Sequence, residues 1–381
     1  MAYDGQLNTN KVFASLFNMI ISLQVFSAGI TDLGGIYGTR KVDGTLYGDT
    51  KLYISTDALK TYPWDGTDDT GSYNLLTVKR PPAPVQEKIV IDIFRQIPVT
   101  VDEYLTKQAF LDEGSFGSFN GVILSWLQIT KEVYEHTTFT ANIIVSAKAK
   151  ATDLGDIALY APDAGFTGKD LLVYKAQELY RQIEDYVNEL GEPSREFNDN
   201  GFLRNYHLND FDIVVPLGVL SSVNKHDVPF LFNEDSKPVF KEVHWKYFGA
   251  INTSGATMTG TNTTVRALVE KDYSVGSPAV ITHCFPGDLL PNLATYLANE
   301  TYTATFEARP SINDDITVLL IHKQDYPIMS AFSVGTSFFN ARRLDMNHYL
   351  TFGHNPVYDA HLGEHALLSL ETVNTAPVPA P

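Results

Sequence analysis

The stretch that most limits how this chain folds is EKIVIDIFRQIPVTVDEYLTKQAF, residues 87–110. From Ile89 to Val101 apolar side chains dominate and β-branched ones lead, which predicts one long strand. The nearest candidate partner is residues 44–55, but residues 56–86 separate the two segments, many more than a tight hairpin loop uses. A two-stranded ribbon is marginally stable by itself in water, so this one is expected to lie on another surface.

The charge balance of the chain is acidic. Its 45 Asp and Glu residues against 28 Lys and Arg give a formal net charge of −17, which disfavours sequence-independent binding to nucleic acid phosphates. The single cysteine, Cys284, excludes an intrachain disulfide and a cysteine-based metal cluster, and suits a reducing compartment. With 44% hydrophobic residues in 381, the chain is expected to gain its stability from packing and from assembly.

The N-terminal sequence KVFASLFNMIISLQVFSAGI, residues 11–30, is the place where a signal peptide or a membrane span would fit. Polar residues interrupt it and no cluster of positive charge precedes it, so neither is expected. Its apolar residues recur at helical spacing between an N-cap at Asn10 or Thr9 and a stop at Gly29. This pattern predicts an amphipathic helix, and no membrane partner is expected.

Two further helices are predicted. The first spans about residues 119–136, and its β-branched residues lower its helix propensity, so it is expected to depend on tertiary contacts. The second spans residues 168–190, because Thr167 and Asp170 resemble a capping box and Gly191 supplies a stop. The apolar stripe of this second helix is Leu172, Ala176, Leu179, Ile183, Tyr186 and Leu190.

The segment HLGEH is the sharpest match to a catalytic pattern. His361, Glu364 and His365 have the His-x-x-Glu-His spacing that holds zinc between two imidazoles one helical turn apart, beside a general base. Gly363 interrupts the helix that this needs, and the proline-rich end of the chain follows too soon for a downstream carboxylate ligand. A zinc-dependent hydrolase is therefore the alternative from a different class, while no catalytic residue, cofactor-binding residue or metal ligand is expected.

The order of elements resembles that of tailed-bacteriophage major capsid proteins with the HK97-like fold. An N-terminal arm, a two-stranded extension ending in KIVIDIFRQIPVTVDEY, and a long helix followed by TFTANIIV look like the arm, extended loop and spine helix of that family. The helix at residues 168–190 is similar to the second helix of the peripheral domain, and DFDIVVPLGVLSSV to the start of the axial domain. Residues 314–357 are similar to the strand-rich ending, and the modest size suits a small short-tailed phage.

This resemblance implies an α+β fold with a defined order of parts. The implied parts are an N-terminal arm (1–43), an extended loop (44–112), a spine helix and peripheral domain with the second long helix (113–208), an axial domain (209–305), return strands of the peripheral domain (306–370) and a disordered tail (371–381). From Asn209 onward short strands are expected to replace long helices.

The resemblance also implies a structural function rather than an enzymatic one. Copies of the chain are expected to form the pentamers and hexamers of an icosahedral head that encloses double-stranded DNA without sequence-specific binding. The expected location is the virion, assembled in the host bacterial cytoplasm. No N-terminal coiled-coil scaffolding segment is recognised in the sequence, which implies a separate scaffolding protein or prior cleavage of such a segment. A portal is a further expected partner.

In such a shell the ribbon is expected to lie on the neighbouring subunit, because head-to-tail contacts of this kind close into rings. Two other structural readings stay open: the shell protein of a bacterial encapsulin-type nanocompartment, and a phage tail or fibre component. The candidate intersubunit contacts are Tyr53, Trp64, Ile91, Phe94 and Arg95.

Overall fold

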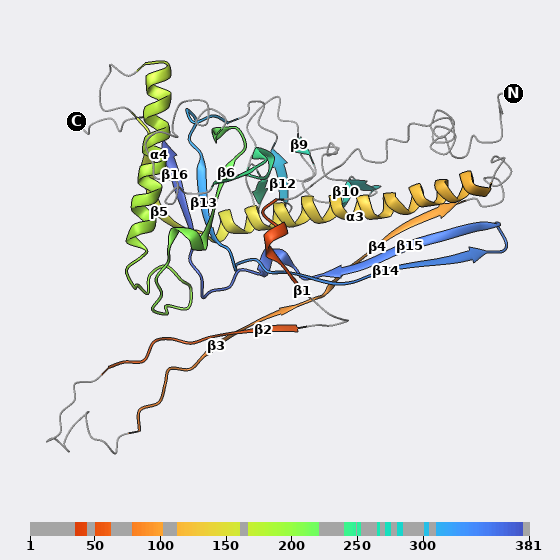
Figure 1. The fold of residues 1–381 in the computed structure, drawn as a ribbon, viewed down its shortest axis with the longest axis horizontal. Helices are drawn as coiled ribbons and strands as arrows, with labels where there is room; N and C mark the ends of the chain where they lie inside the picture. The colour runs from red at the N-terminus through yellow and green to blue at the C-terminus, as the bar shows by residue number, and fades with distance from the viewer. Residues whose placement is uncertain are drawn as a thin grey trace. The chain divides into compact units, whose positions relative to one another are not determined.

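The computed structural model describes the chain in segments (Figure 1). The described residues are 35–43, 50–61, 78–101, 113–160, 167–220, 240–248, 250–252, 265–266, 271–275, 280–284, 301–304 and 310–375. They divide into two compact units, a smaller one with residues 94–136 and 332–353, and a larger one with residues 35–93, 137–331 and those from His354 on. The helix predicted between Asn10 and Gly29 lies outside the described residues.

A five-stranded mixed sheet is the centre of the larger unit. Its strand order is β5 (Thr152–Ala158), β16 (Leu367–Val373), β13 (Thr317–His322), β6 (Phe211–Pro216) and β7 (Phe240–Val243). Strand β13 is antiparallel to β16 and β6, whereas the outer pairs β16–β5 and β6–β7 are parallel. All residues of β6 are buried, as expected for a strand whose two faces are both covered.

This sheet joins strands from several of the expected parts. Strand β5 comes from residues 113–208, β6 and β7 from residues 209–305, and β13 and β16 from the return strands. The boundaries expected at 208/209 and 305/306 therefore do not separate packed units in the described chain. Strand β16 extends to Val373, so residues 371–373, expected to belong to the tail, are part of the sheet.

Helix α4 (Lys169–Glu189) packs on this sheet and confirms the helix predicted at residues 168–190. The inner residues of its predicted stripe, Ala176, Leu179 and Ile183, are fully buried and share one hydrophobic core with the sheet. Burial of each leucine or isoleucine contributes about 1.5–3 kcal/mol. The predicted capping box is wrong: the N-cap is Gly168, whose φ of 59° suits glycine, and no side chain caps the helix.

Helix α3 (Glu113–Lys150) is one continuous helix that begins before and ends after the predicted residues 119–136 (Figure 1). The sequence TTFTANIIV, residues 137–145, has strand-like propensity, which ended the predicted helix early. In the larger unit Phe139, Ile143 and Ile144 of this segment are buried. Tertiary packing therefore overrides local propensity here.

Three strands form the sheet of the smaller unit. Strand β15 (Asp345–His354) lies between β14 (Ile328–Asn340) and β4 (Ile93–Val101), and β14 and β15 are a hairpin. Thr100 Oγ1 of β4 donates a hydrogen bond to Asn347 Oδ1 of β15 at 2.6 Å, which links the two strands. Tyr134 of α3 packs edge-on against Phe352, with the ring centroids 5.5 Å apart.

The run predicted as one strand from Ile89 to Val101 is two strands with different partners. Strand β3 (Val85–Val90) pairs antiparallel with β2 (Thr50–Ser55), as the predicted ribbon requires, but β4 joins β15 instead. Ile89, Ile91 and Val101 are buried within this chain. The expectation that the whole run needs an external surface is therefore wrong for these residues, because their own chain already buries them.

The other strands after Asn209 are short, as predicted, whereas β14 and β15 in the same part of the chain are longer than expected. Strands β8 (Ala250–Asn252), β12 (Thr301–Ala304) and β9 (Val265–Arg266) form one sheet in that order, and β10 (Lys271–Val275) pairs with β11 (Val280–Cys284). In the larger unit β1 (Lys41–Asp43) pairs in parallel with the first residues of β14. None of the helices described here is long and apolar enough to cross a membrane.

Candidate functional site

The β2–β3 ribbon is held by polar contacts to two segments of the larger unit. Asp57, just after β2, accepts hydrogen bonds from Arg195 Nη1 at 2.6 Å and from the backbone N–H of Leu203 at 3.0 Å. On the other strand, Glu87 Oε1 accepts a hydrogen bond from the backbone N–H of Gly363 at 2.9 Å. Both strands of the ribbon are therefore anchored beside the segment that connects them.

Arg204 and Glu364 extend this anchor. Arg204 Nη2 donates hydrogen bonds to the carbonyl oxygen of Thr56 at 2.7 Å and to Glu364 Oε1 at 2.8 Å. Burial raises the pKa of Glu364, but hydrogen bonds from Ser55 and Arg204 outweigh it and hold this pKa below its usual value. Glu364 is therefore ionised at neutral pH and links the end of β2 to Arg204.

Gly363 allows the backbone of its turn to approach the ribbon closely. A Cβ atom at this position would lie 3.1 Å from Glu87 Oε1 and 3.2 Å from side-chain atoms of Asn200 and Asp199. These distances are shorter than ordinary van der Waals contact, so a side chain here would push Glu87 away. The glycine inside HLGEH therefore reflects a packing requirement.

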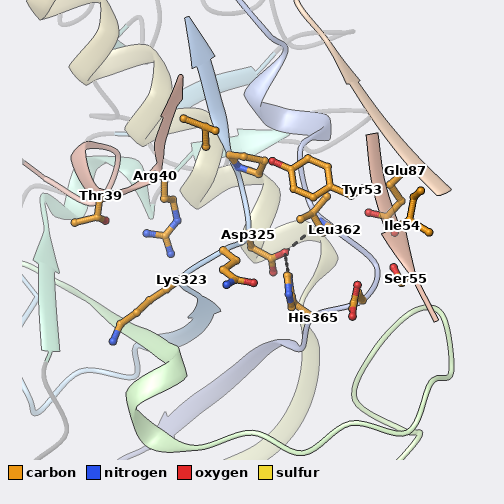
Figure 2. A pocket seen from close by; sticks show the side chains of 14 residues that line it. Thr39, Arg40, Tyr53, Ile54, Ser55, Glu87, Lys323, Asp325, Leu362 and His365 are labelled. Atoms are coloured by element: carbon orange, nitrogen blue, oxygen red, sulfur yellow. Dashed lines mark hydrogen bonds and ion pairs between the residues drawn. The ribbon is translucent and has the colours of Figure 1, made fainter. Parts of the chain in front are cut away.

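Asp325 is fully buried and fixes the turn at residues 361–365 (Figure 2). Its carboxylate lies 3.2 Å from Nδ1 of His361, from Nδ1 of His365 and from the backbone N–H of Leu362. Since a carboxylate only accepts hydrogen bonds, both imidazoles carry their proton on Nδ1. Burial raises the pKa of Asp325, but the hydrogen bonds from His361 and His365 hold it below its usual value.

The pKa values of the neighbouring histidines His361 and His322 are shifted in opposite directions. Burial lowers the pKa of His361, but the hydrogen bond and the charge of Asp325 raise it above its usual value overall. The ring of His322 stacks on that of His365 with the centroids 4.0 Å apart. Burial and the adjacent His365 lower the pKa of His322 to about 4, so this ring is neutral at neutral pH.

These contacts give the HLGEH residues structural partners in place of zinc. Residues 361–365 form a turn, so the two imidazoles are not one helical turn apart. His361 and His365 both direct Nδ1 at Asp325, and the Glu364 carboxylate pairs with Arg204. Within the part of the chain that the structure describes, no group of three or more His, Cys, Asp and Glu side chains is arranged to hold a metal ion.

A pocket of about 440 Å³ lies beside the ribbon, with Arg40, Lys323 and His365 among its lining residues (Figure 2). Its charged groups bind other groups of the same chain. Arg40 Nη1 and Lys241 Nζ pair with the buried Asp212 at 2.5 and 2.9 Å, and Lys323 Nζ donates to the carbonyl oxygen of Asn209. These pairings indicate a structural role for the pocket, which lies between the ribbon and the sheet.

The residues predicted as intersubunit contacts have different environments in the structure. Tyr53 of β2 is half-buried at the pocket, and burial raises the pKa of its hydroxyl. Ile91 is 3% exposed, so it packs inside the subunit, whereas Phe94 is 47% exposed. The guanidinium of Arg95 lies over the Tyr134 ring, 5.5 Å from its centroid. Trp64 lies outside the described residues.

Two exposed residues of the ribbon were missed in the sequence. Leu52 and Ile54 both lie on the exposed face of β2, opposite Lys88 and Gln86 of β3. The alternation in TKLYIS, residues 50–55, carries this signal, because alternate residues of a strand share a face. This face of β2 therefore carries two exposed apolar side chains, of which Ile54 also lines the pocket.

Asp57 makes the anchor of the ribbon dependent on pH. The hydrogen bonds from Arg195 and Leu203 lower the pKa of Asp57 to about 2. A lowered pKa in the folded state stabilises the protein above the usual carboxyl value of about 4, and this contribution is lost as the pH falls toward 2. We predict that Asp57→Asn lowers the unfolding temperature at pH 6, and that the difference from the native chain shrinks as the pH falls.

Thermal unfolding of unassembled subunits, followed by circular dichroism across this pH range, measures the effect. The control is Asp359→Asn, because the Asp359 side chain is 74% exposed and lies 3.9 Å from Lys150. The unfolding temperature of Asp359→Asn should differ little from that of the native chain at any pH. A difference between Asp57→Asn and the native chain that stays constant from pH 6 to pH 2 would contradict the prediction.

Comparison with known proteins gives one consistent family. Residues 3–355 match a family model described as "Phi29-like phage major capsid protein". The capsid structure of Staphylococcus phage Andhra aligns with a TM-score of 0.57 and 11% identity, over 92% of this chain and 87% of that chain. A chain from the structure of the head fiber and inner core protein gp22 of bacteriophage P68 aligns with a TM-score of 0.55 and 10% identity, over 92% and 88%. No curated protein matches the chain.

Proposed function

Because the chain belongs to the family of Phi29-like phage major capsid proteins, we propose that its copies form the icosahedral head of a tailed phage around double-stranded DNA. The match over residues 3–355 carries this proposal. The chain is a structural subunit that forms a shell and is part of the virion. Its mixed helix and sheet fold, shared with phage capsid structures, is consistent with the HK97-like fold.

We propose that the ribbon makes the contact that joins subunits into pentamers and hexamers. Leu52 and Ile54 on the outward face of β2 are exposed, and so are Leu59 and Val78 on either side of the segment that connects the strands. Exposed apolar groups of this kind are typical of surfaces that another chain covers. A head-to-tail contact in which each ribbon lies on the next copy closes into rings.

Two segments of the chain have a defined role in the proposed shell. Residues 44–112 act as the extended loop and α3 as the spine helix. Phe94 and Arg95 are both exposed and stay candidates, as do Tyr53 and Trp64. Ile91 leaves the set, because its side chain is already buried in its own subunit.

The proposed shell contains DNA without binding it tightly. A net charge of −17 repels phosphate groups, so the wall resists the packaged DNA and does not condense it. A separate scaffolding protein and a portal are the proposed further partners, and the host cytoplasm is the proposed place of assembly. We assign the chain no catalytic role, since Asp325 and Arg204 engage the HLGEH residues structurally.

Electron microscopy and sedimentation of the full chain, expressed alone and with the scaffolding protein of its phage, test this function. We expect rings and closed shells. A chain that stays monomeric at high concentration with the scaffolding protein present would contradict the proposal, and rods or trimers would favour a tail component. Shells that hold an enzyme as cargo would point to a nanocompartment. DNA affinity that persists at moderate salt would contradict containment without binding.

A further inference from the structure

An Asn–Gly pair lies in a turn beside the anchor of the ribbon. The sequence has two such pairs, Asn120–Gly121 and Asn200–Gly201. The first pair lies inside helix α3, whereas Gly201 ends a turn in which its backbone N–H donates to the carbonyl oxygen of Asn198 at 3.2 Å. Gly201 has φ 64°, and a Cβ built on it would meet no atom within 4 Å. The space around Gly201 is therefore open enough for its backbone to move.

Asn200 joins segments of the larger unit that lie far apart in the sequence. Its side-chain Nδ2 donates to Glu87 Oε1 of β3 at 3.4 Å, and its backbone N–H donates to the carbonyl oxygen of Gly363 at 3.1 Å. The preceding residue, Asp199, has Oδ2 3.4 Å from Nε2 of His361. The Asn200 side chain therefore ties strand β3 to this part of the larger unit.

An asparagine that precedes a glycine loses its side-chain amide without an enzyme. The glycine N–H gives its proton to hydroxide, and the nitrogen attacks the asparagine Cγ. The new N–Cγ bond forms, the Cγ–Nδ2 bond breaks, and Nδ2 leaves as ammonia after it takes a proton from water. Water then opens the succinimide ring at either carbonyl and gives aspartate or isoaspartate. Glycine permits this closure because it has no Cβ in the way and adopts many backbone conformations.

The surroundings of Gly201 favour this reaction more than those of Gly121. Arg195 Nη1 donates to the carbonyl oxygen of Gly201 at 2.9 Å, and its positive charge favours the deprotonated backbone nitrogen. The hydrogen bond from Gly201 to Asn198 must open first, and a turn opens more readily than the interior of a helix. Gly121 lies within α3, where ring closure requires the helix to unwind.

We propose that Asn200 is a site of spontaneous deamidation, and that the reaction releases strand β3 from its anchor. The product is a carboxylate that donates no hydrogen bond and lies beside Glu87 and Asp199, so repulsion between like charges replaces a hydrogen bond. Isoaspartate also lengthens the main chain of the turn by one carbon. The ion pair of Asp57 with Arg195 still holds the end of β2. The fraction of subunits with a loosened β3 therefore grows with the age of the protein.

Storage of full-length unassembled subunits at pH 8, followed by mass spectrometry of tryptic peptides, measures the reaction. The peptide of residues 196–204 should gain about 1 Da, and fragment ions should place the change at Asn200. The peptide of residues 108–131 contains Asn120 as the internal control, which should react at least about tenfold more slowly. Asn200→Gln should not show the gain, because a glutamine has to close a larger ring.

Hydrogen exchange in β3 measures the release of the strand. Asn200→Asp reproduces the charge of the product, so its β3 amides should exchange about threefold faster than those of the fresh native chain. The native chain after storage should approach the same rate. Asn200→Gln keeps a neutral amide, and Asn205→Asp adds one negative charge at an exposed side chain. Both of these control variants should exchange like the fresh native chain.

The outcomes separate the modification site from its effect on the ribbon. Deamidation at Asn200 that is no faster than at Asn120 would overturn the site. Native exchange rates in β3 of Asn200→Asp would overturn its effect on the ribbon. Equal acceleration by Asn200→Gln or by Asn205→Asp would show that a charge beside Glu87 is not the cause, which also contradicts the proposal. Because the reaction needs no second copy, it should occur whether or not the chain forms a shell.

Discussion

Replacement of residues 62–77 by a short Gly-Ser linker is expected to abolish shell assembly while the subunit still folds. The contacts that hold the ribbon lie outside this segment: Asp57 binds Arg195, and Glu87 binds Gly363. The linker therefore leaves the anchor in place and removes only the part proposed to reach the next copy. Removal of all residues 56–86 would also take Asp57 away and would destabilise the subunit itself.

Two measurements decide this prediction. Electron microscopy and sedimentation should show no rings or shells from the linker variant, and circular dichroism should show an unfolding temperature within about 2 °C of the native subunit. A Gly-Ser linker as long as residues 62–77 is the control for loop length and should also fail to assemble. Closed shells from the short-linker variant, or failure of its subunit to fold, would contradict the account.

Asp325→Ala is expected to cause the largest loss of subunit stability. The carboxylate is fully buried and binds His361, His365 and the backbone N–H of Leu362. Its removal leaves these buried donors without their acceptor, and the loss of one partner from a buried charged pair costs about 3–5 kcal/mol. We expect the free energy of unfolding in urea to fall by about this amount.

A matched exposed carboxylate shows whether burial is the cause. Asp359→Ala removes a carboxylate that is 74% exposed and 3.9 Å from Lys150, and should cost less than about 0.5 kcal/mol. Because the turn at residues 361–365 also holds Glu87, Asp325→Ala should speed hydrogen exchange in β3. Equal losses of stability in the two variants would contradict the assignment of Asp325 as the residue that fixes this turn.

The sequence predicts a helix or strand correctly where the residues of that element alone carry the pattern that identifies it. Helix α4 has an apolar stripe at helical spacing and a glycine just beyond its end, and both features are local. The end of α3 was beyond prediction, because the threonines at 137, 138 and 140 are buried by tertiary contacts that make their strand propensity irrelevant. The same limit applies to β4, whose partner β15 follows far later in the chain.

The site was less predictable than the fold. HLGEH has the spacing of a zinc motif, yet its environment is set by Asp325 and Arg204, which lie elsewhere in the sequence. The resemblance in element order identified the family correctly, since that order survives sequence change. The burial of individual residues did not follow from it: Ile91 is buried in its own subunit, and Leu52 and Ile54, which were not singled out from the sequence, are exposed.

The most direct test of the ribbon's role is a density map of the assembled shell that separates individual strands. We predict that residues 50–61 and 78–90 of every copy lie on a neighbouring copy, with Leu52 and Ile54 covered at that contact. A map in which the ribbon contacts only its own subunit, with these two side chains still facing solvent, would contradict it.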